Sequence, residues 1–155
     1  MTPTVARMSE SDWRAFAVIR LRALTEALGE SDPQYRKEVA FTAAQWRRRL
    51  RDHAQFAALV GDRPVGLIGA QQENPDSVYL YSLWLDPAAR GRGFARPLVA
   101  AAVDWARDQR VRTVTLRVSA DNTAARGVYE SLGFTATTAE SPDPRDEVAM
   151  SLSVS

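Results

Sequence analysis

The chain has no cysteine, one histidine and one lysine among its 155 residues. The absence of cysteine excludes disulfides, thiol nucleophiles and cysteine-ligated metals. A single histidine, His53, cannot build a histidine metal site, and its place directly after an arginine-rich helical segment predicts a surface or capping residue. We therefore expect no bound metal.

The sequence also lacks an excess of one charge and any long apolar run. Twenty Lys and Arg balance 19 Asp and Glu for a formal net charge of +1, which argues against a dedicated nucleic-acid binder. No apolar run approaches the roughly 18 residues of a membrane span, and residues 1–5 lack the features of a signal peptide. We expect a cytoplasmic protein without nucleic-acid or membrane partners, folded as one domain over residues 1–155.

Apolar periodicity divides the chain into helices and strands. Capping-box patterns at residues 9–12 and 42–45 predict two helix starts, and Gly29 ends the first helix. Residues 31–41 are predicted as a polar connection. The arginines of the second helix, Arg47, Arg48, Arg49 and Arg51, are predicted as a solvated face. Strands are predicted at 4–8, 56–60, 65–71, 78–85, 114–119, 134–137 and 148–154, with further helices at 98–109 and 123–132.

This element order predicts an α/β (α+β) domain with a mixed sheet and helices on both faces. Residues 78–85 form a near-continuous apolar run, which is typical of a central strand covered on both sides. A turn with two glycines, Gly91 and Gly93, follows this strand and leads into a helix. Such a turn aims backbone N–H groups and the positive end of the helix dipole at one place, so it predicts an anion site.

Two common phosphate-binding motifs do not fit this turn. A P-loop requires a lysine after the second glycine of the motif, and the turn has none. A dinucleotide fingerprint requires a small third residue where Arg96 stands, and no acidic residue follows at the position expected beyond the helix. Neither a P-loop NTPase nor a Rossmann-type dinucleotide-binding protein is therefore predicted.

Two segments resemble the GNAT superfamily of acyl-CoA-dependent N-acyltransferases. Arg90, Gly93 and Ala95 match the pattern Gln/Arg-x-x-Gly-x-Gly/Ala, and residues 122–134 match Asn-x-x-Ala-x-x-x-Tyr-x-x-x-Gly-Phe. The resemblance implies a mostly antiparallel sheet of six to seven strands that splays between its fourth and fifth strands. It also implies that acetyl-CoA is the co-substrate.

The resemblance assigns coenzyme A to specific residues. Backbone amides of the turn would wrap the pyrophosphate with added charge from Arg92 and Arg96, and residues 83–85 would pair with the pantetheine arm. Pro97 departs from the pattern but is tolerated in the first helical turn. The residues expected at the cofactor are Leu83, Trp84, Leu85, Arg90, Gly91, Arg92, Gly93, Phe94, Ala95, Arg96, Asn122, Ala125 and Tyr129.

The same resemblance makes Tyr129 the general acid that protonates the departing thiolate while an amine attacks the thioester directly. The acceptor is expected to be a primary amine of a small molecule or peptide. Tyr79 and Arg117 occupy the positions at which some relatives carry a glutamate that acts as the general base. Glu73 and Glu147 are the alternative bases, acting through water.

The acceptor site is expected between the loop at residues 29–41, the exposed face of the fourth strand and the loop at 138–146. The side chains that these segments supply are Asp32, Tyr35, Glu38, Tyr81, Asp143 and Asp146. Two alternatives stay open: a non-catalytic acyl-CoA sensor on the same fold, and an interaction domain that uses the arginines of residues 47–51. Exposed strand edges make a homodimer reasonable.

Overall fold

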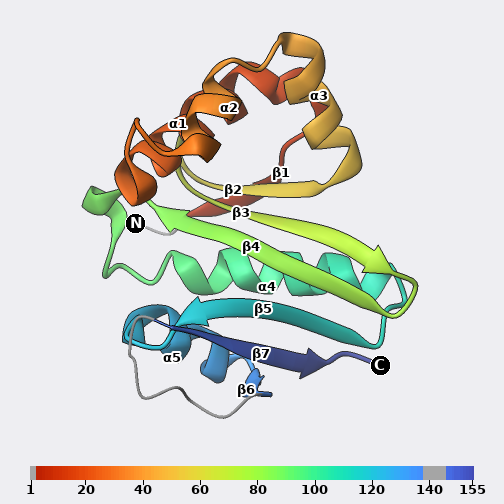
Figure 1. Ribbon diagram of the computed structural model, residues 1–155. Helices are drawn as coiled ribbons and strands as arrows, with labels where there is room; N and C mark the ends of the chain where they lie inside the picture. The colour runs from red at the N-terminus through yellow and green to blue at the C-terminus, as the bar shows by residue number, and fades with distance from the viewer. Residues whose placement is uncertain (1–2, 138–145) are drawn as a thin grey trace.

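The computed structural model describes residues 3–137 and 146–155. Seven strands form one sheet in the order β1-β2-β3-β4-β5-β7-β6 (Figure 1). The elements are β1 (Thr4–Arg7), α1 (Trp13–Leu28), α2 (Pro33–Val39), α3 (Ala43–Asp52), β2 (Ala54–Val60), β3 (Arg63–Asn74), β4 (Ser77–Leu85), α4 (Ala95–Asp108), β5 (Thr113–Ser119), α5 (Thr123–Ser131), β6 (Thr135–Ala136) and β7 (Glu147–Ser153), with 3-10 turns at Glu10–Asp12 and Pro87–Ala89. The predicted fold class is confirmed. β1 and β6 are the sheet edges, where the homodimer remains a prediction.

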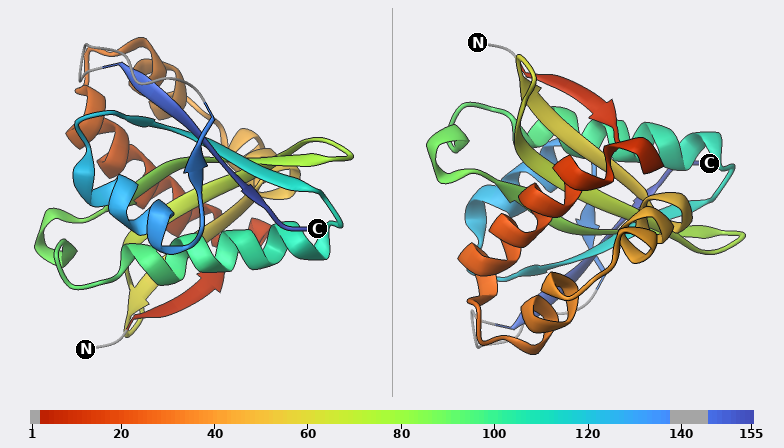
Figure 2. Two further views of the ribbon diagram at one scale, coloured as in Figure 1. Left: turned by 90° about the horizontal axis from the view of Figure 1, so that it is seen from below. Right: turned by 90° about the horizontal axis from the view of Figure 1, so that it is seen from above.

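Helices cover both faces of the sheet. Figure 2 shows α1, α2 and α3 in front when the molecule is seen from above, and α4 and α5 in front when it is seen from below. Alternation along the strands supplies both cores. Phe56 and Ile68 join the core that α4 completes, whereas Ala57 and Leu67 face the other side and pack with residues of α1.

β4 and β5 separate shortly after they begin. They run parallel, and among the described residues they pair at only three positions, which end with Tyr79 opposite Thr115. All other neighbouring strands are antiparallel. The second half of β4 therefore has a free edge toward β5, as the expected splay requires.

A bulge interrupts β4 beside this free edge. Tyr81 pairs with Gly69 and Trp84 with Leu67, so β4 contains one residue more than β3 over this interval. Ser82 has a left-handed backbone with φ of 57°. Because the extra residue reverses the alternation, Leu80 belongs to the core beneath α4 whereas Trp84 packs on α1.

Two predictions in the N-terminal half are wrong. The polar connection contains the helix α2, which Asp32 caps by accepting a hydrogen bond from the Gln34 amide at 2.8 Å. The helix carries no apolar stripe because the residue it buries completely is Glu38. Arg49 is not fully solvated either, since its side chain is 19% exposed and lies 3.7 Å from the Glu38 carboxylate.

The second capping box forms as predicted, with the Thr42 amide and the Gln45 side chain 2.8 Å apart. Pro97 lies within the first turn of α4, where its missing N–H removes no helical hydrogen bond. Within residues 3–137 and 146–155, no helix is long and apolar enough to cross a membrane.

Candidate active site

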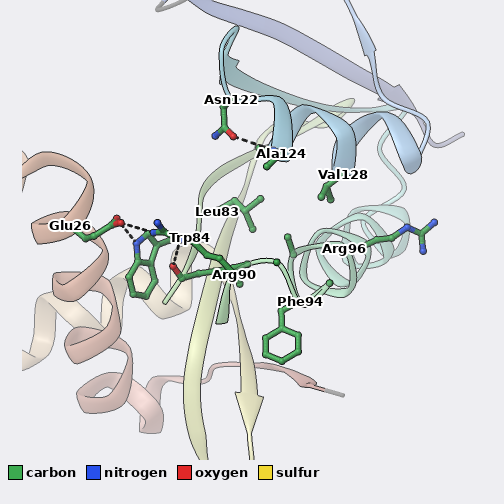
Figure 3. A pocket seen from close by; sticks show the side chains of 14 residues that line it. Glu26, Leu83, Trp84, Arg90, Phe94, Arg96, Asn122, Ala124 and Val128 are labelled. Atoms are coloured by element: carbon green, nitrogen blue, oxygen red, sulfur yellow. Dashed lines mark hydrogen bonds and ion pairs between the residues drawn. The ribbon is translucent and has the colours of Figure 1, made fainter. Parts of the chain in front are cut away.

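A cavity of about 670 Å³ opens where β4 leaves β5. It is lined by Glu26, Leu83, Trp84, Leu85, Arg90, Gly91, Gly93, Phe94, Ala95, Arg96, Asn122, Ala124, Ala125 and Val128. Figure 3 shows Leu83 of β4 and Val128 of α5 projecting toward the same space. The structure thus brings together most residues expected at the cofactor. Arg92 and Tyr129 are not part of this lining.

The turn before α4 forms one wall of the cavity. Gly91 and Gly93 have φ of 76° and 78°, a conformation that L side chains rarely adopt. α4 begins at Ala95 without a side-chain cap, and no backbone N–H from residue 91 to residue 96 donates a hydrogen bond to another group of the described chain. At this helix N-terminus a row of backbone donors therefore has no partner within the described chain, which suits an anion.

Arg90 does not point its charge freely into the cavity. Its guanidinium donates to the Leu85 carbonyl oxygen at 3.1 Å and to Glu26 Oε1 at 2.6 Å. Glu26 also accepts a hydrogen bond from Trp84 Nε1 at 2.9 Å, and these two donors, Trp84 first, hold the pKa of Glu26 below its usual value. Arg90 thus ties the turn to β4 and α1, and the carboxylate in the lining is neutralised.

Arg92 and Arg96 remain as the cations of the turn. Arg92 is exposed, and Arg96 donates to Ser131 Oγ on α5 at 3.3 Å. Glu26 could not be found from the motif, because α1 lies far from it along the chain.

α5 forms the opposite wall. Asn122 caps this helix by accepting a hydrogen bond from the Ala125 amide at 3.2 Å. Ala124, Ala125 and Val128 present small apolar side chains to the cavity. The motif indicated only Ala125, but the helical spacing of these three residues was available in the sequence.

Tyr129 is 6% exposed and packs edge-on against Phe134, with ring centroids 5.8 Å apart. Burial, and then the neighbouring Tyr79, raises the pKa of Tyr129 to about 12. No hydrogen bond to the Tyr129 hydroxyl is found among the described residues, although no fully buried side-chain polar atom there lacks a partner. The phenolic oxygen must therefore reach accessible space.

Tyr79 lies near both alternative bases. Burial, then Glu147 and to a smaller extent Glu73 raise the pKa of Tyr79, whereas Arg117 opposes this rise. Glu147 is 3.5 Å from Arg117 Nε, and its side chain is 58% exposed. The structure thus gathers these charges around Tyr79, but it pairs Glu147 with a cation.

The face of β4 toward α3 carries a second polar cluster. The Tyr81 hydroxyl lies 2.6 Å from His53 Nδ1 and 2.7 Å from Gln55 Nε2. The Tyr81 ring lies across Gly69, where an added Cβ would come within 2.5 Å of it, and stacks on Tyr79 at 6.4 Å. Burial, and then Arg49, lowers the pKa of His53. His53 is thus the predicted C-cap of α3, but it also has an unforeseen partner on β4.

The other expected acceptor residues have different surroundings. Glu38 is fully buried, so it is not accessible to a substrate, and its predicted place in the acceptor site is wrong. Tyr35 is half-buried on α2, and the exposed Asp146 accepts a hydrogen bond from the Ala120 amide at 2.9 Å through its carbonyl. Asp143 lies outside the described residues.

A family model described as the acetyltransferase (GNAT) family matches residues 13–134. The chain belongs to this family. This is the family that the motif resemblance implied. The predicted family is confirmed, whereas the reaction, the co-substrate and the roles of individual residues remain predictions.

Curated relatives match part of this GNAT chain. Mycothiol acetyltransferase of Rhodococcus erythropolis is 45% identical over 62 residues, which are 40% of this chain and 21% of that protein. The Salinispora tropica enzyme of the same name is 40% identical over 106 residues, covering 61% of this chain and 34% of that protein. The chain therefore spans a fifth to a third of these relatives, and the single domain over residues 1–155 remains a prediction.

Solved GNAT structures share the fold. An acetyltransferase from Streptococcus pneumoniae has a TM-score of 0.80 at 16% identity and covers 99% of each chain. The structure of yncA from Salmonella typhimurium with its cofactor acetyl-CoA has a TM-score of 0.76 at 18% identity, covering 100% of this chain and 95% of that one. PaiA of Thermoplasma acidophilum in complex with coenzyme A has a TM-score of 0.73 at 15% identity and covers 99% of each chain.

Proposed function

We propose that the protein transfers the acetyl group of acetyl-CoA to a primary amine of a small molecule or peptide by direct attack on the thioester. The observation that carries this proposal is the row of unpartnered amides from residue 91 to residue 96 at a cavity beside the splayed strands. A pyrophosphate needs such donors, and the apolar walls of Leu83, Ala124 and Val128 suit the pantetheine chain.

The wall residues fit coenzyme A in charge as well as shape. Within the lining the carboxylate of Glu26 is paired with Arg90, so it does not repel a diphosphate. Arg92 and Arg96 add positive charge beside the amides. In this binding mode the pantetheine arm would run along residues 83–85, whose backbone N–H groups are the donors available to the thioester oxygen.

Tyr129 is the proposed general acid. The amine nitrogen bonds to the thioester carbon, the C–S bond breaks, and the phenol gives its proton to the departing sulfur. Since the pKa of Tyr129 is raised to about 12, the phenol is protonated at neutral pH and can serve as a donor. A thiol has a pKa of about 8.5, below that of the phenol, so full proton transfer to a free thiolate would be uphill. The phenol therefore donates to the sulfur while its negative charge develops, and the proton that the attacking amine loses replaces the one that the phenol gives up. This proton passes from the amine nitrogen through water to the Tyr129 oxygen as the amide forms and restores the phenol.

The basicity of the acceptor decides whether a dedicated base is needed. A lysine-like amine costs roughly 4 to 5 kcal/mol to deprotonate at pH 7, whereas an α-amine costs about 1 kcal/mol. Glu147 is already paired with Arg117, and Glu73 is exposed at the end of β3. This favours an α-amine or another weakly basic amine, with Glu73 or Glu147 acting through water. Tyr35 and Tyr81 are the proposed aromatic contacts of the acceptor.

A panel of amines tests this function by the release of the CoA thiol from acetyl-CoA. The panel comprises polyamines, aminoglycosides, amino acids, peptides with free N-termini and, because of the relatives' name, a mycothiol-related amine. We expect thiol release with α-amines and none in the absence of an acceptor. Tight acetyl-CoA binding without release for any amine would instead support a non-catalytic acyl-CoA sensor.

A further inference from the structure

Arg20 is a buried cation on α1 whose whole guanidinium is used. It is 7% exposed, and it donates from Nε to Glu38 Oε1 at 2.9 Å and from Nη2 to Glu38 Oε2 at 3.0 Å. Its remaining nitrogen, Nη1, donates to Ser82 Oγ at 2.7 Å. The side chain therefore joins α1, α2 and the bulge of β4 at one point.

Glu38 fixes the direction of this guanidinium. Glu38 is 0% exposed and forms a bidentate ion pair with Arg20. Its carboxylate also accepts a hydrogen bond from Gln34 of the same helix. Arg49 of α3 adds a second cation 3.7 Å from the same carboxylate. A guanidinium held at two nitrogens by a planar carboxylate has little freedom left, so the third nitrogen is aimed at Ser82.

Ser82 is the residue of β4 that most needs such support. Its φ of 57° is disfavoured for a side chain with Cβ, and the described residues contain one other such non-glycine residue, Arg110. A bulge that relaxed would shift β4 by one residue against β3. That shift would turn residues 83–85 to the opposite face, and these residues line the cavity.

We propose that Arg20 is a positioning residue for acetyl transfer, which holds the Ser82 bulge and thereby the cofactor wall at residues 83–85. The role of that wall rests on the proposed function. Arg20 is not among the residues that line the cavity, and the hydrogen bond that connects it to β4 is the one to Ser82. The α2 helix takes part because it supplies the carboxylate that orients Arg20.

Glycine at position 82 separates positioning from stability. Glycine adopts the left-handed conformation without cost, whereas alanine removes the hydroxyl and keeps the strain. We expect Ser82→Ala to lower kcat/KM for acetyl-CoA about tenfold and Ser82→Gly to lower it less than threefold. Arg20→Gln should resemble Ser82→Ala, and the double variant with Ser82→Gly should recover most of kcat/KM while its Tm stays low. Arg110→Gly is the matched control outside the site and should leave kcat/KM unchanged.

Equal losses for Ser82→Ala and Ser82→Gly, or no recovery in the double variant, would overturn the proposal. If Arg20→Gln does not fold, the two Ser82 variants still decide the question because they leave the ion pair intact. Calorimetric titration with acetyl-CoA measures binding at the same wall without turnover. The rise in the acetyl-CoA Kd should follow the same order among the variants as the loss of kcat/KM. Absence of amine transfer in the unmodified protein would therefore count against the proposed function and leave this test in force.

Discussion

The proposed cofactor and acceptor sides of the site are built in different ways. On the cofactor side, residues 83–97 run from β4 through the turn into α4, so adjacent residues supply the wall, the glycines and the free amides. On the acceptor side, Arg20 and Ser82 are 62 positions apart and His53 and Tyr81 are 28 positions apart. The glycine turn and the start of α4 depend on local backbone conformation, whereas the other side depends on contacts between distant elements, one of which, Arg20 with Ser82, is proposed to support the wall at residues 83–85.

This difference separates what a substitution can do on each side. A change in the turn alters a few backbone angles and should affect cofactor affinity first. A change in the buried polar cluster leaves a charged or polar group without its partner and should affect the stability of the whole fold first.

Glu38→Ala should give the largest effect because it leaves Arg20 and Arg49 without their carboxylate in a buried place. Breaking a buried ion pair from one side costs about 3–5 kcal/mol of unfolding free energy. Urea denaturation measures this loss, and Glu30→Ala at an exposed position should stay within about 0.5 kcal/mol of the unmodified protein. Similar values for the two variants would mean that the acceptor side does not depend on this pair.

Tyr129→Phe should act on chemistry and spare binding. Loss of a general acid typically lowers turnover by about 10²- to 10⁴-fold, and we expect kcat to fall at least about hundredfold. The acetyl-CoA Kd should change less than about twofold, since the hydroxyl has no hydrogen-bond partner within the described chain to lose. Unchanged turnover would remove the acid role.

Gly93→Ala should weaken acetyl-CoA binding, because φ of 78° strains a residue with Cβ by about 1–2 kcal/mol. If the turn relaxes to avoid this strain, Kd rises about tenfold. Gly127→Ala is the matched control, since Gly127 lies in α5 without positive φ and with open space at its Cβ position. Calorimetric titration measures the acetyl-CoA Kd of both variants. An equal loss of affinity in the two would mean that the turn has no special role.

His53 should give the smallest effect, through the pH dependence of stability. Its pKa is held below the ordinary 6.5, so the unfolded chain binds the proton more readily than the folded one. The contribution of His53 to stability is thus present above that pH and declines as the pH falls through the window below it. Thermal unfolding from pH 7.5 to 5.5 should show a steeper loss for the unmodified protein than for His53→Gln. Parallel curves would mean that His53 is as easily protonated in the fold as in the unfolded chain.

The sequence predicted the cavity wall at residues 83–97 well because its signals are local. Periodicity located β4 and α4, and two glycines with a proline just inside the helix identified a turn whose conformation follows from residue type. The same reasoning placed Arg90 at the cofactor but did not foresee its partner Glu26, which lies on a different helix.

The acceptor side could not be predicted in the same way. α2 buries a glutamate in place of an apolar stripe, and its arginine partners lie on α1 and α3. A hydrophobic pattern cannot indicate a buried charge whose partner is remote in sequence. The bulge at Ser82 likewise carries no glycine to announce its left-handed backbone, and the pairing of His53 with Tyr81 emerges only when β2 and β4 share one sheet.

A crystal structure of the protein with acetyl-CoA tests the central claim most directly. The account predicts that the backbone amides of residues 91–96 donate hydrogen bonds to the pyrophosphate and that the thioester sulfur lies within hydrogen-bonding distance of the Tyr129 hydroxyl. A diphosphate bound away from these amides, or a sulfur remote from Tyr129, would contradict it.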